Sequence, residues 1–80
     1  MTEAEARAIL ALIRGGKRFS TRIQEEGWGL EAAKGGKFRL WSFQFEPDGT
    51  EHKSDETLTE DQALARLKIY TFARIKSGLR

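Results

Sequence analysis

Apolar residues recur at helical spacing near the start of the chain, and they predict a helix over residues 2–14. Thr2 and Glu5 have the spacing of a capping box, and Gly15-Gly16 supplies a stop after the last turn. The apolar face of this helix consists of Ala6, Ile9, Leu10 and Ile13. We therefore expect an amphipathic N-terminal helix that packs on one side only.

Alternation of apolar and polar residues replaces the helical period after Lys17. Residues 17–23 favour a strand, although Thr21 with Gln24 is also compatible with the start of a short helix over residues 18–24. A turn is expected at residues 25–27, followed by a second alternating stretch. The pattern predicts a hairpin here.

The strongest strand signal lies in residues 37–46, which are rich in aromatic side chains. Gly35-Gly36 before it predicts a chain reversal, and Pro47-Asp48-Gly49 after it has the composition of a tight turn. Residues 50–57 should then pair back as an edge strand, whose charges discourage pairing between molecules.

The end of the chain predicts a second helix over residues 59–77. Thr59 and Gln62 form a second possible capping box, and Gly78 supplies a stop. The complete pattern predicts an α+β fold, with an N-terminal helix, a three- or four-stranded antiparallel sheet and a C-terminal helix. Both helices are expected to pack on one sheet face.

Length and composition are those of one small domain spanning residues 1–80. Hydrophobic residues make up 39% of the chain, enough for a core, and cysteine is absent, which excludes a disulfide. No apolar run approaches the length of a membrane span, and the first residues are acidic where a signal peptide would be basic. We expect a cytoplasmic protein that does not associate with membranes.

The charges are segregated although the net charge is only +2. Residues 46–61 contain seven acids and one base, whereas residues 7–22 and 66–80 each contain five bases and no acid. Bases gathered on one side indicate a possible contact with nucleic acid. The residues predicted for such a contact are Arg14, Lys17, Arg18, Arg22 and Lys76.

Catalytic and metal-binding chemistry finds no support in the sequence. His52 is the one histidine and stands in a polar stretch, so a nucleophile–histidine–acid set has only one possible base. No other ligand-type residue lies at a convincing metal spacing from it. We expect a protein that is not an enzyme and that has no catalytic residues, metal or cofactor.

The strand over residues 37–46 is apolar on both faces, which raises the question of which face the helices cover. Trp41, Phe43 and Phe45 lie on one face, and Phe38 and Leu40 on the other. We expect the three aromatics to face the helices. An exposed patch would then remain on the open face, formed by Phe38 and Leu40, joined by Trp28 and Leu30; the alternative is that these residues are ordinary core.

A basic and aromatic stripe is predicted on the last helix. Arg66, Tyr70 and Arg74 follow one another at spacings of four, on the side opposite its apolar arc. Such a stripe can grip anionic groups, and the alternative is a solvated face with intrahelical cation-π contacts.

The order helix, three strands, helix resembles the double-stranded RNA-binding domain, in which Phe38 to Ala65 correspond to two strands and the start of a helix. Where that family holds phosphates with lysines, this chain has Thr59-Glu60-Asp61-Gln62. Residues 28–75 more loosely resemble the sheet and helix with which tyrosine integrases bind their arm sites. The sequence is assigned to neither family.

The sequence favours a binding module that docks a protein partner, in the manner of a regulator or inhibitor. Inhibitors from phages and mobile elements, anti-CRISPR proteins among them, share its size and its lack of catalytic residues. The alternatives are a nucleic-acid-binding accessory domain and a homodimer formed through the sheet face. The residues predicted to bind a protein partner are Trp28, Phe38, Leu40, Arg66, Tyr70 and Arg74.

Overall fold

The computed structural model describes the backbone of residues 1–80 and every side chain except that of Ile23. The elements in chain order are α1 (Glu3–Arg14), β1 (Phe19–Ile23), β2 (Glu26–Ala32), the 3₁₀ turn η1 (Lys34–Gly36), β3 (Phe38–Phe45), β4 (Glu51–Leu58), α2 (Glu60–Leu67) and α3 (Phe72–Gly78). This α+β layout confirms the fold class that the sequence predicts, with three helices and a four-stranded antiparallel sheet.

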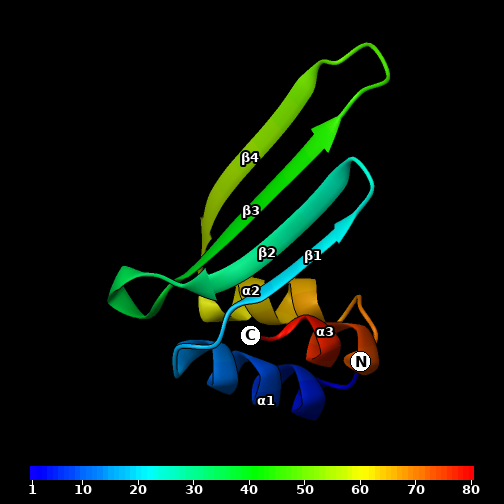
Figure 1. Ribbon diagram of the computed structural model, residues 1–80. Helices are drawn as coiled ribbons and strands as arrows, with labels where there is room; N and C mark the ends of the chain where they lie inside the picture. Colours follow the sequence, from blue (N-terminus) through cyan, green and yellow to red (C-terminus); the bar gives the residue numbers. More distant parts are fainter.

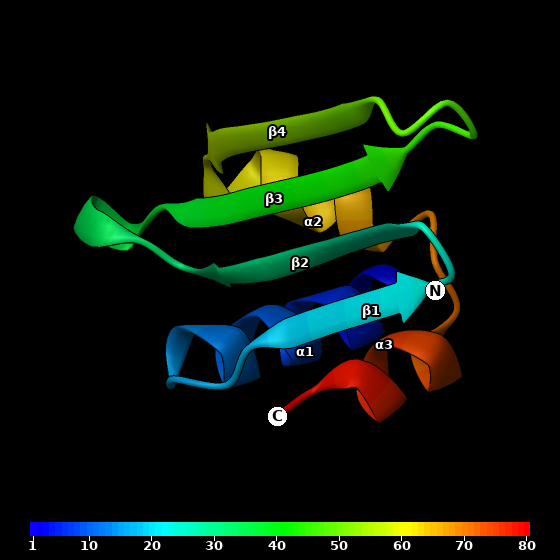
Figure 2. The same cartoon turned by 45° about the horizontal axis from the view of Figure 1, so that its top comes forward.

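The sheet is a meander in which each strand pairs with the next, in the order β1-β2-β3-β4 (Figure 2). All the helices lie on one side of it, and the hairpin of β3 and β4 extends beyond them (Figure 1). The first hairpin turns at Gln24 and Glu25, because Ile23 pairs with Glu26 and Gln24 takes a positive φ of 55°. The predicted turn at 25–27 is thus displaced by one residue.

Both predicted capping boxes are present. The Thr2 hydroxyl accepts the N–H of Glu5 at 3.1 Å, and the Glu5 carboxylate accepts the N–H of Thr2 at 2.9 Å. Thr59 and Gln62 make the same reciprocal pair at the start of α2. These local bonds satisfy backbone donors that the first helical turn leaves free, and they fix where each helix begins.

The predicted single helix over residues 59–77 is wrong, because the chain breaks it into α2 and α3. Thr71 adopts an extended conformation and caps α3, its hydroxyl accepting the N–H of Arg74 at 3.4 Å. The break reorients the second segment so that Ile75 becomes fully buried. Gly78 packs against the Phe19 ring as the last residue of α3, so its main role is close packing rather than a stop.

The core lies between the sheet and the helices. Its apolar side chains come from every helix and from all four strands. The buried residues are Ala6, Ile9, Leu10, Ile13, Phe19, Leu30, Phe38, Leu58, Ala63, Leu64, Leu67 and Ile75. Among the described side chains, no buried nitrogen or oxygen atom lacks a hydrogen-bond partner.

The prediction for the two faces of β3 is wrong. Phe38 is only 1% exposed and belongs to the core, as does Leu30, and both Leu40 and Trp28 pack against that core. The register explains the choice, because Phe38 stands between two apolar residues, Ala32 on β2 and Leu58 on β4. The face opposite the helices is therefore the one that carries the other aromatic side chains of β3.

Candidate functional site

Three aromatic side chains of β3, here named the aromatic row, lie on the sheet face that the helices leave open: Trp41, Phe43 and Phe45. The Trp41 and Phe43 rings are nearly parallel, with centroids 6.3 Å apart and an interplanar angle of 8°. Phe45 meets Phe43 edge-on at 6.0 Å and is 37% exposed. The other two rings are half-buried although no helix covers them.

Two glycines of β2 let these rings lie down on the sheet. Gly27 stands opposite Phe43, and a Cβ added to it would come within 2.7 Å of the Phe43 ring. Gly29 stands opposite Trp41 in the same way, with no room for a Cβ beneath the indole. The rings thus cover bare backbone, while their outer faces meet solvent.

Most charges beside the aromatic row pair with one another, whereas Arg22 lies over the Phe43 ring and donates to the Gln24 carbonyl. Arg39 donates to both neighbouring strands, reaching Glu31 at 2.7 Å and Asp55 at 2.9 Å. These bonds lower the pKa of the Asp55 carboxyl and raise the pKa of the Arg39 guanidinium. Lys53 pairs with Glu51 at 3.1 Å. Little net charge therefore borders the row.

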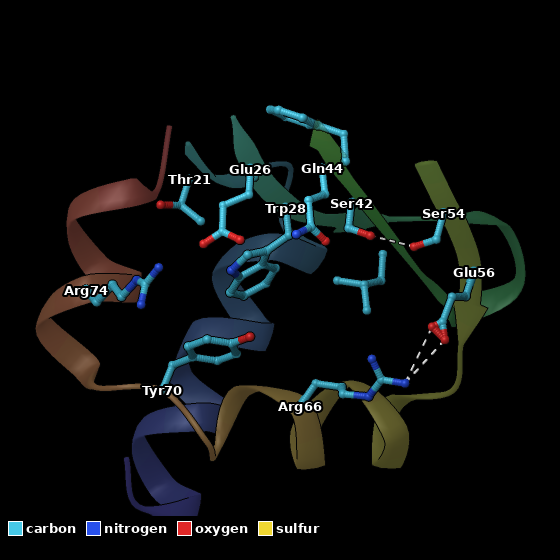
Figure 3. A pocket seen from close by; sticks show the side chains of 13 residues that line it. Thr21, Glu26, Trp28, Ser42, Gln44, Ser54, Glu56, Arg66, Tyr70 and Arg74 are labelled. Carbon is cyan, nitrogen blue, oxygen red and sulfur yellow. Dashed lines mark hydrogen bonds and ion pairs between the residues drawn. The ribbon is translucent and has the colours of Figure 1, made fainter. Parts of the chain in front are cut away.

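A second feature, here named the underside pocket, lies on the helix side where the sheet projects beyond α2 and α3 (Figure 3). It is an open cavity of about 480 Å³, within the roughly 300–1,000 Å³ range of ligand sites. Its walls combine apolar, hydroxyl and charged groups. They come from Thr21, Glu26, Gly27, Trp28, Leu40, Ser42, Phe43, Gln44, Ser54, Glu56, Arg66, Tyr70 and Arg74.

Many polar and aromatic groups of the underside pocket are engaged with one another. The Trp28 and Tyr70 rings stack with centroids 4.6 Å apart, and the Arg74 guanidinium lies 5.7 Å from the Tyr70 centroid. Arg66 pairs with Glu56 at 3.2 Å (Figure 3). These contacts give the pocket a fixed shape, and they reduce the charge it offers to a ligand.

The residues predicted to bind a protein partner do not lie on the open face of the sheet. Five of the residues predicted to bind a partner line the underside pocket: Trp28, Leu40, Arg66, Tyr70 and Arg74. They meet there although α2 ends at Leu67, because the turn between the helices carries Tyr70 under β2. Phe38 does not join them, since it is enclosed in the core. The exposed aromatic row was missed, and the paired glycines of β2 were the signal for it.

The basic residues predicted to contact nucleic acid are spread over three elements and the loop after α1. Arg14 pairs with Glu60 at 3.4 Å and lies over Phe38, on the helix side. Arg22 lies over Phe43 at 5.5 Å, on the open face. Arg18 is bonded through its backbone to Arg80, and Lys76 lies over the Phe72 ring. Lys17 is exposed after α1. They do not form one compact surface.

The described part of the chain contains no cluster of metal-ligating side chains and no helix that could span a membrane. No three described histidine, aspartate or glutamate side chains gather as a metal site would require. The His52 imidazole is 61% exposed and lies 3.6 Å from the Glu46 carboxylate. Of the helices just described, none is both long and apolar enough to cross a membrane.

Comparison with known proteins gives no relative to this chain. No protein-family model matches it, and neither the curated proteins nor the solved structures contain a significant match. The aromatic row and the underside pocket are therefore the features that bear on its function.

Proposed function

We propose that this protein is a non-enzymatic binding module that docks a protein partner on the open face of its sheet. The observation that carries the proposal is the aromatic row, three neighbouring rings on a face that no helix covers. Tryptophan, other aromatics and arginine dominate the binding energy of protein interfaces when they stand near the centre of the contact. The row stands on β3, an inner strand of the sheet.

The charge pattern favours a protein over a nucleic acid as the occupant of this face. A sheet that stacks bases combines its aromatic rings with cations that track the phosphates. Here Arg39 is held between two carboxylates and Lys53 is paired with Glu51, so that Arg22, over the Phe43 ring, is the cation left to meet a phosphate. An apolar centre with a balanced rim is the usual anatomy of a protein interface. We infer a partner that offers an apolar patch with charges of both signs around it.

The size of the domain is consistent with a regulator or inhibitor that acts by occupying a surface. A rigid sheet face needs no moving parts and no cofactor to block a partner. Small phage-encoded and mobile-element inhibitors, including anti-CRISPR proteins, work within a similar length of chain. This comparison supports the class of function and identifies no particular target.

The proposal is tested by affinity purification with variants of each surface. A Phe43→Ser, Phe45→Ser protein removes two rings of the aromatic row, and Arg66→Glu, Arg74→Glu alters the underside pocket. Circular dichroism first confirms that both variants are folded. We expect a partner that the unmodified protein enriches, that the pocket variant retains and that the row variant loses. A partner lost with the pocket variant and kept with the row variant would contradict the proposal.

Nucleic-acid binding is the second class to be tested in the same proteins. Fluorescent single- and double-stranded oligonucleotides are titrated at about 50 mM salt, where phosphate contacts are strongest. We expect no saturable binding. Binding that weakens steeply with salt and is lost in an Arg18→Glu, Arg22→Glu variant would replace the protein-docking proposal with the nucleic-acid one.

A further inference from the structure

The rest of the chain covers one edge of the sheet, along β1, and leaves the other edge, along β4, uncovered. Along β1, Arg18 exchanges two backbone hydrogen bonds with Arg80, at 3.1 and 2.9 Å, and Phe19 forms a bridge with Leu79. The α3 helix continues this cover (Figure 2). No element lies outside β4 in either view (Figures 1 and 2). The outer edge of β4 is therefore the one open to strand addition.

The hydrogen-bond pattern shows which residues of β4 direct their backbone groups outward. In the β3–β4 turn, Glu46 donates its N–H to the Thr50 carbonyl at 2.7 Å, so the backbone of Thr50 faces β3. Along an antiparallel strand, successive residues point their backbone N–H and C=O groups to opposite sides. The even-numbered residues of β4 thus bond to β3, and the odd-numbered ones present their N–H and C=O groups to the free edge. These are Glu51, Lys53, Asp55 and Thr57.

We propose that a second copy of this chain pairs antiparallel with β4, on a two-fold axis at Ser54. The register follows from the sequence of the strand, Glu-His-Lys-Ser-Asp-Glu-Thr-Leu, whose charges are complementary about its serine. Lys53 then stands opposite Asp55 of the second copy, and His52 stands opposite its Glu56. Each pair occurs twice, because the interface is isologous.

The neighbouring registers are opposed by the same charges. Only shifts by an even number of residues keep outward backbone groups opposite one another, and the smallest is a shift of two. A shift in one direction places Lys53 against its own copy and Glu51 against Asp55. A shift in the other places Asp55 against Asp55. Like charges directly opposite are unfavourable in a sheet, so both neighbouring registers are disfavoured. The register centred on His52 again sets Glu51 opposite Lys53, but it pairs only residues 51–53 of β4, so the register on Ser54 keeps the longer complementary pairing.

Contacts already present within the chain extend into this pairing. On the open face, Asp55 is bonded to Arg39 and would meet Lys53 of the second copy. On the helix side, the Ser42 and Ser54 hydroxyls are 2.5 Å apart, and Ser54 would continue this ladder to its own copy. The two four-stranded sheets would join into one of eight strands. Because the axis is perpendicular to the sheet, both aromatic rows would lie on the same face, about 14 Å apart. The pairing rests on β4 alone and does not depend on the proposed function.

Cysteine cross-linking tests the register directly, because the chain contains no cysteine of its own. In Ser54→Cys, the two introduced thiols face each other in a non-hydrogen-bonded pair, with Cα atoms about 4.5 Å apart, within disulfide reach. In His52→Cys, the control, they are about 13 Å apart and cannot join. We expect a disulfide-linked dimer from the first protein under mild oxidation, formed much faster than from the second. Equal rates, or no dimer from Ser54→Cys, would overturn the proposal.

Charge exchange provides an independent test by analytical ultracentrifugation. Lys53→Glu alone places two acids opposite each other at each site, and Asp55→Lys alone places two lysines there. Each variant should dimerise at least about tenfold more weakly than the unmodified protein.

Mixed in equal amounts, the two charge variants should form a heterodimer. The introduced glutamate of one chain then faces the introduced lysine of the other at one site, while the original Asp55 and Lys53 face each other at the second. Failure of the mixture to associate, while the unmodified protein dimerises, would contradict the register. An unmodified protein that stays monomeric up to millimolar concentration would contradict the pairing itself.

Discussion

The indole of Trp41 lies directly against the backbone of Gly29 on the neighbouring strand, leaving no room for a Cβ. Replacing Gly29 with alanine must therefore displace the ring or the strand. Overpacking of this kind costs about 1–3 kcal/mol, which lowers the midpoint of thermal unfolding by about 4–8 °C per kcal/mol in a domain of this size. Differential scanning calorimetry of Gly29→Ala measures the shift.

Gly15→Ala is the matched control for this change. Gly15 has a φ of −79°, and the nearest atoms to an added Cβ are backbone oxygens at 3.5 Å, an ordinary contact. Its unfolding temperature should change by no more than about 2–4 °C. If Gly29→Ala were as stable as Gly15→Ala, Trp41 would not rest on β2 as described.

The two faces of β3 predict opposite sensitivities to truncation. Phe38 is 1% exposed, and Phe38→Ala should lower the free energy of unfolding by about 3–5 kcal/mol. Phe45 is 37% exposed at the end of the aromatic row, and Phe45→Ala should cost less than about 1.5 kcal/mol. Urea unfolding of the two variants side by side gives both values. The reverse order of costs would mean that the helices cover the other face.

The bond between Arg39 and Asp55 predicts a pH dependence of stability. The pKa of the Asp55 carboxyl lies below its ordinary value, because the Arg39 guanidinium stabilises the ionised form. The contribution of the ionised Asp55 carboxylate to the free energy of unfolding is therefore fully present above the unfolded-state pKa of about 3.9. It is lost as the pH falls through the lower folded-state pKa. Carboxyl NMR titration of the unmodified protein and of Arg39→Gln follows the group directly.

We expect Arg39→Gln to raise the pKa of Asp55 towards its ordinary value and to reduce the loss of stability in that acidic window. Arg7→Gln serves as the control, since Arg7 pairs with Glu3 on α1, at 3.8 Å. It should leave the Asp55 titration unchanged. An Asp55 pKa that stays low without Arg39 would assign the shift to another group.

Local signals in the sequence were sufficient for most of the fold. The capping residues Thr2 and Thr59 fix the starts of two helices by bonds within one turn, and such bonds depend little on the rest of the molecule. Pro47-Asp48-Gly49 similarly forms the predicted turn between β3 and β4. The break between α2 and α3 was missed because Thr71 continues a helical pattern as well as it caps a new helix. Burial of Ile75 decides between them, and that is a tertiary effect.

The assignment of faces failed for a similar reason. Trp41, Phe43 and Phe45 together have more apolar surface than Phe38 and Leu40, so the hydrophobic pattern alone places these three aromatics in the core. The neighbours across the sheet decide otherwise, because Gly27 and Gly29 offer flat backbone, while the buried Leu30 and Leu58 stand opposite Leu40 and Phe38 on the helix side. Arg66, Tyr70 and Arg74 all line the underside pocket even though the helix predicted to carry them is interrupted. The turn at Tyr70 keeps all three on the side of the underside pocket.

The most direct test of docking through the open face uses the two tryptophans as reporters. Trp41 belongs to the aromatic row and Trp28 to the underside pocket, so their indole N–H resonances report the two surfaces separately. The partner recovered by affinity purification is added to ¹⁵N-labelled protein, and both signals are followed by NMR. We predict that the Trp41 signal shifts or broadens with added partner while the Trp28 signal keeps its position. A shift of Trp28 with Trp41 unchanged would contradict it.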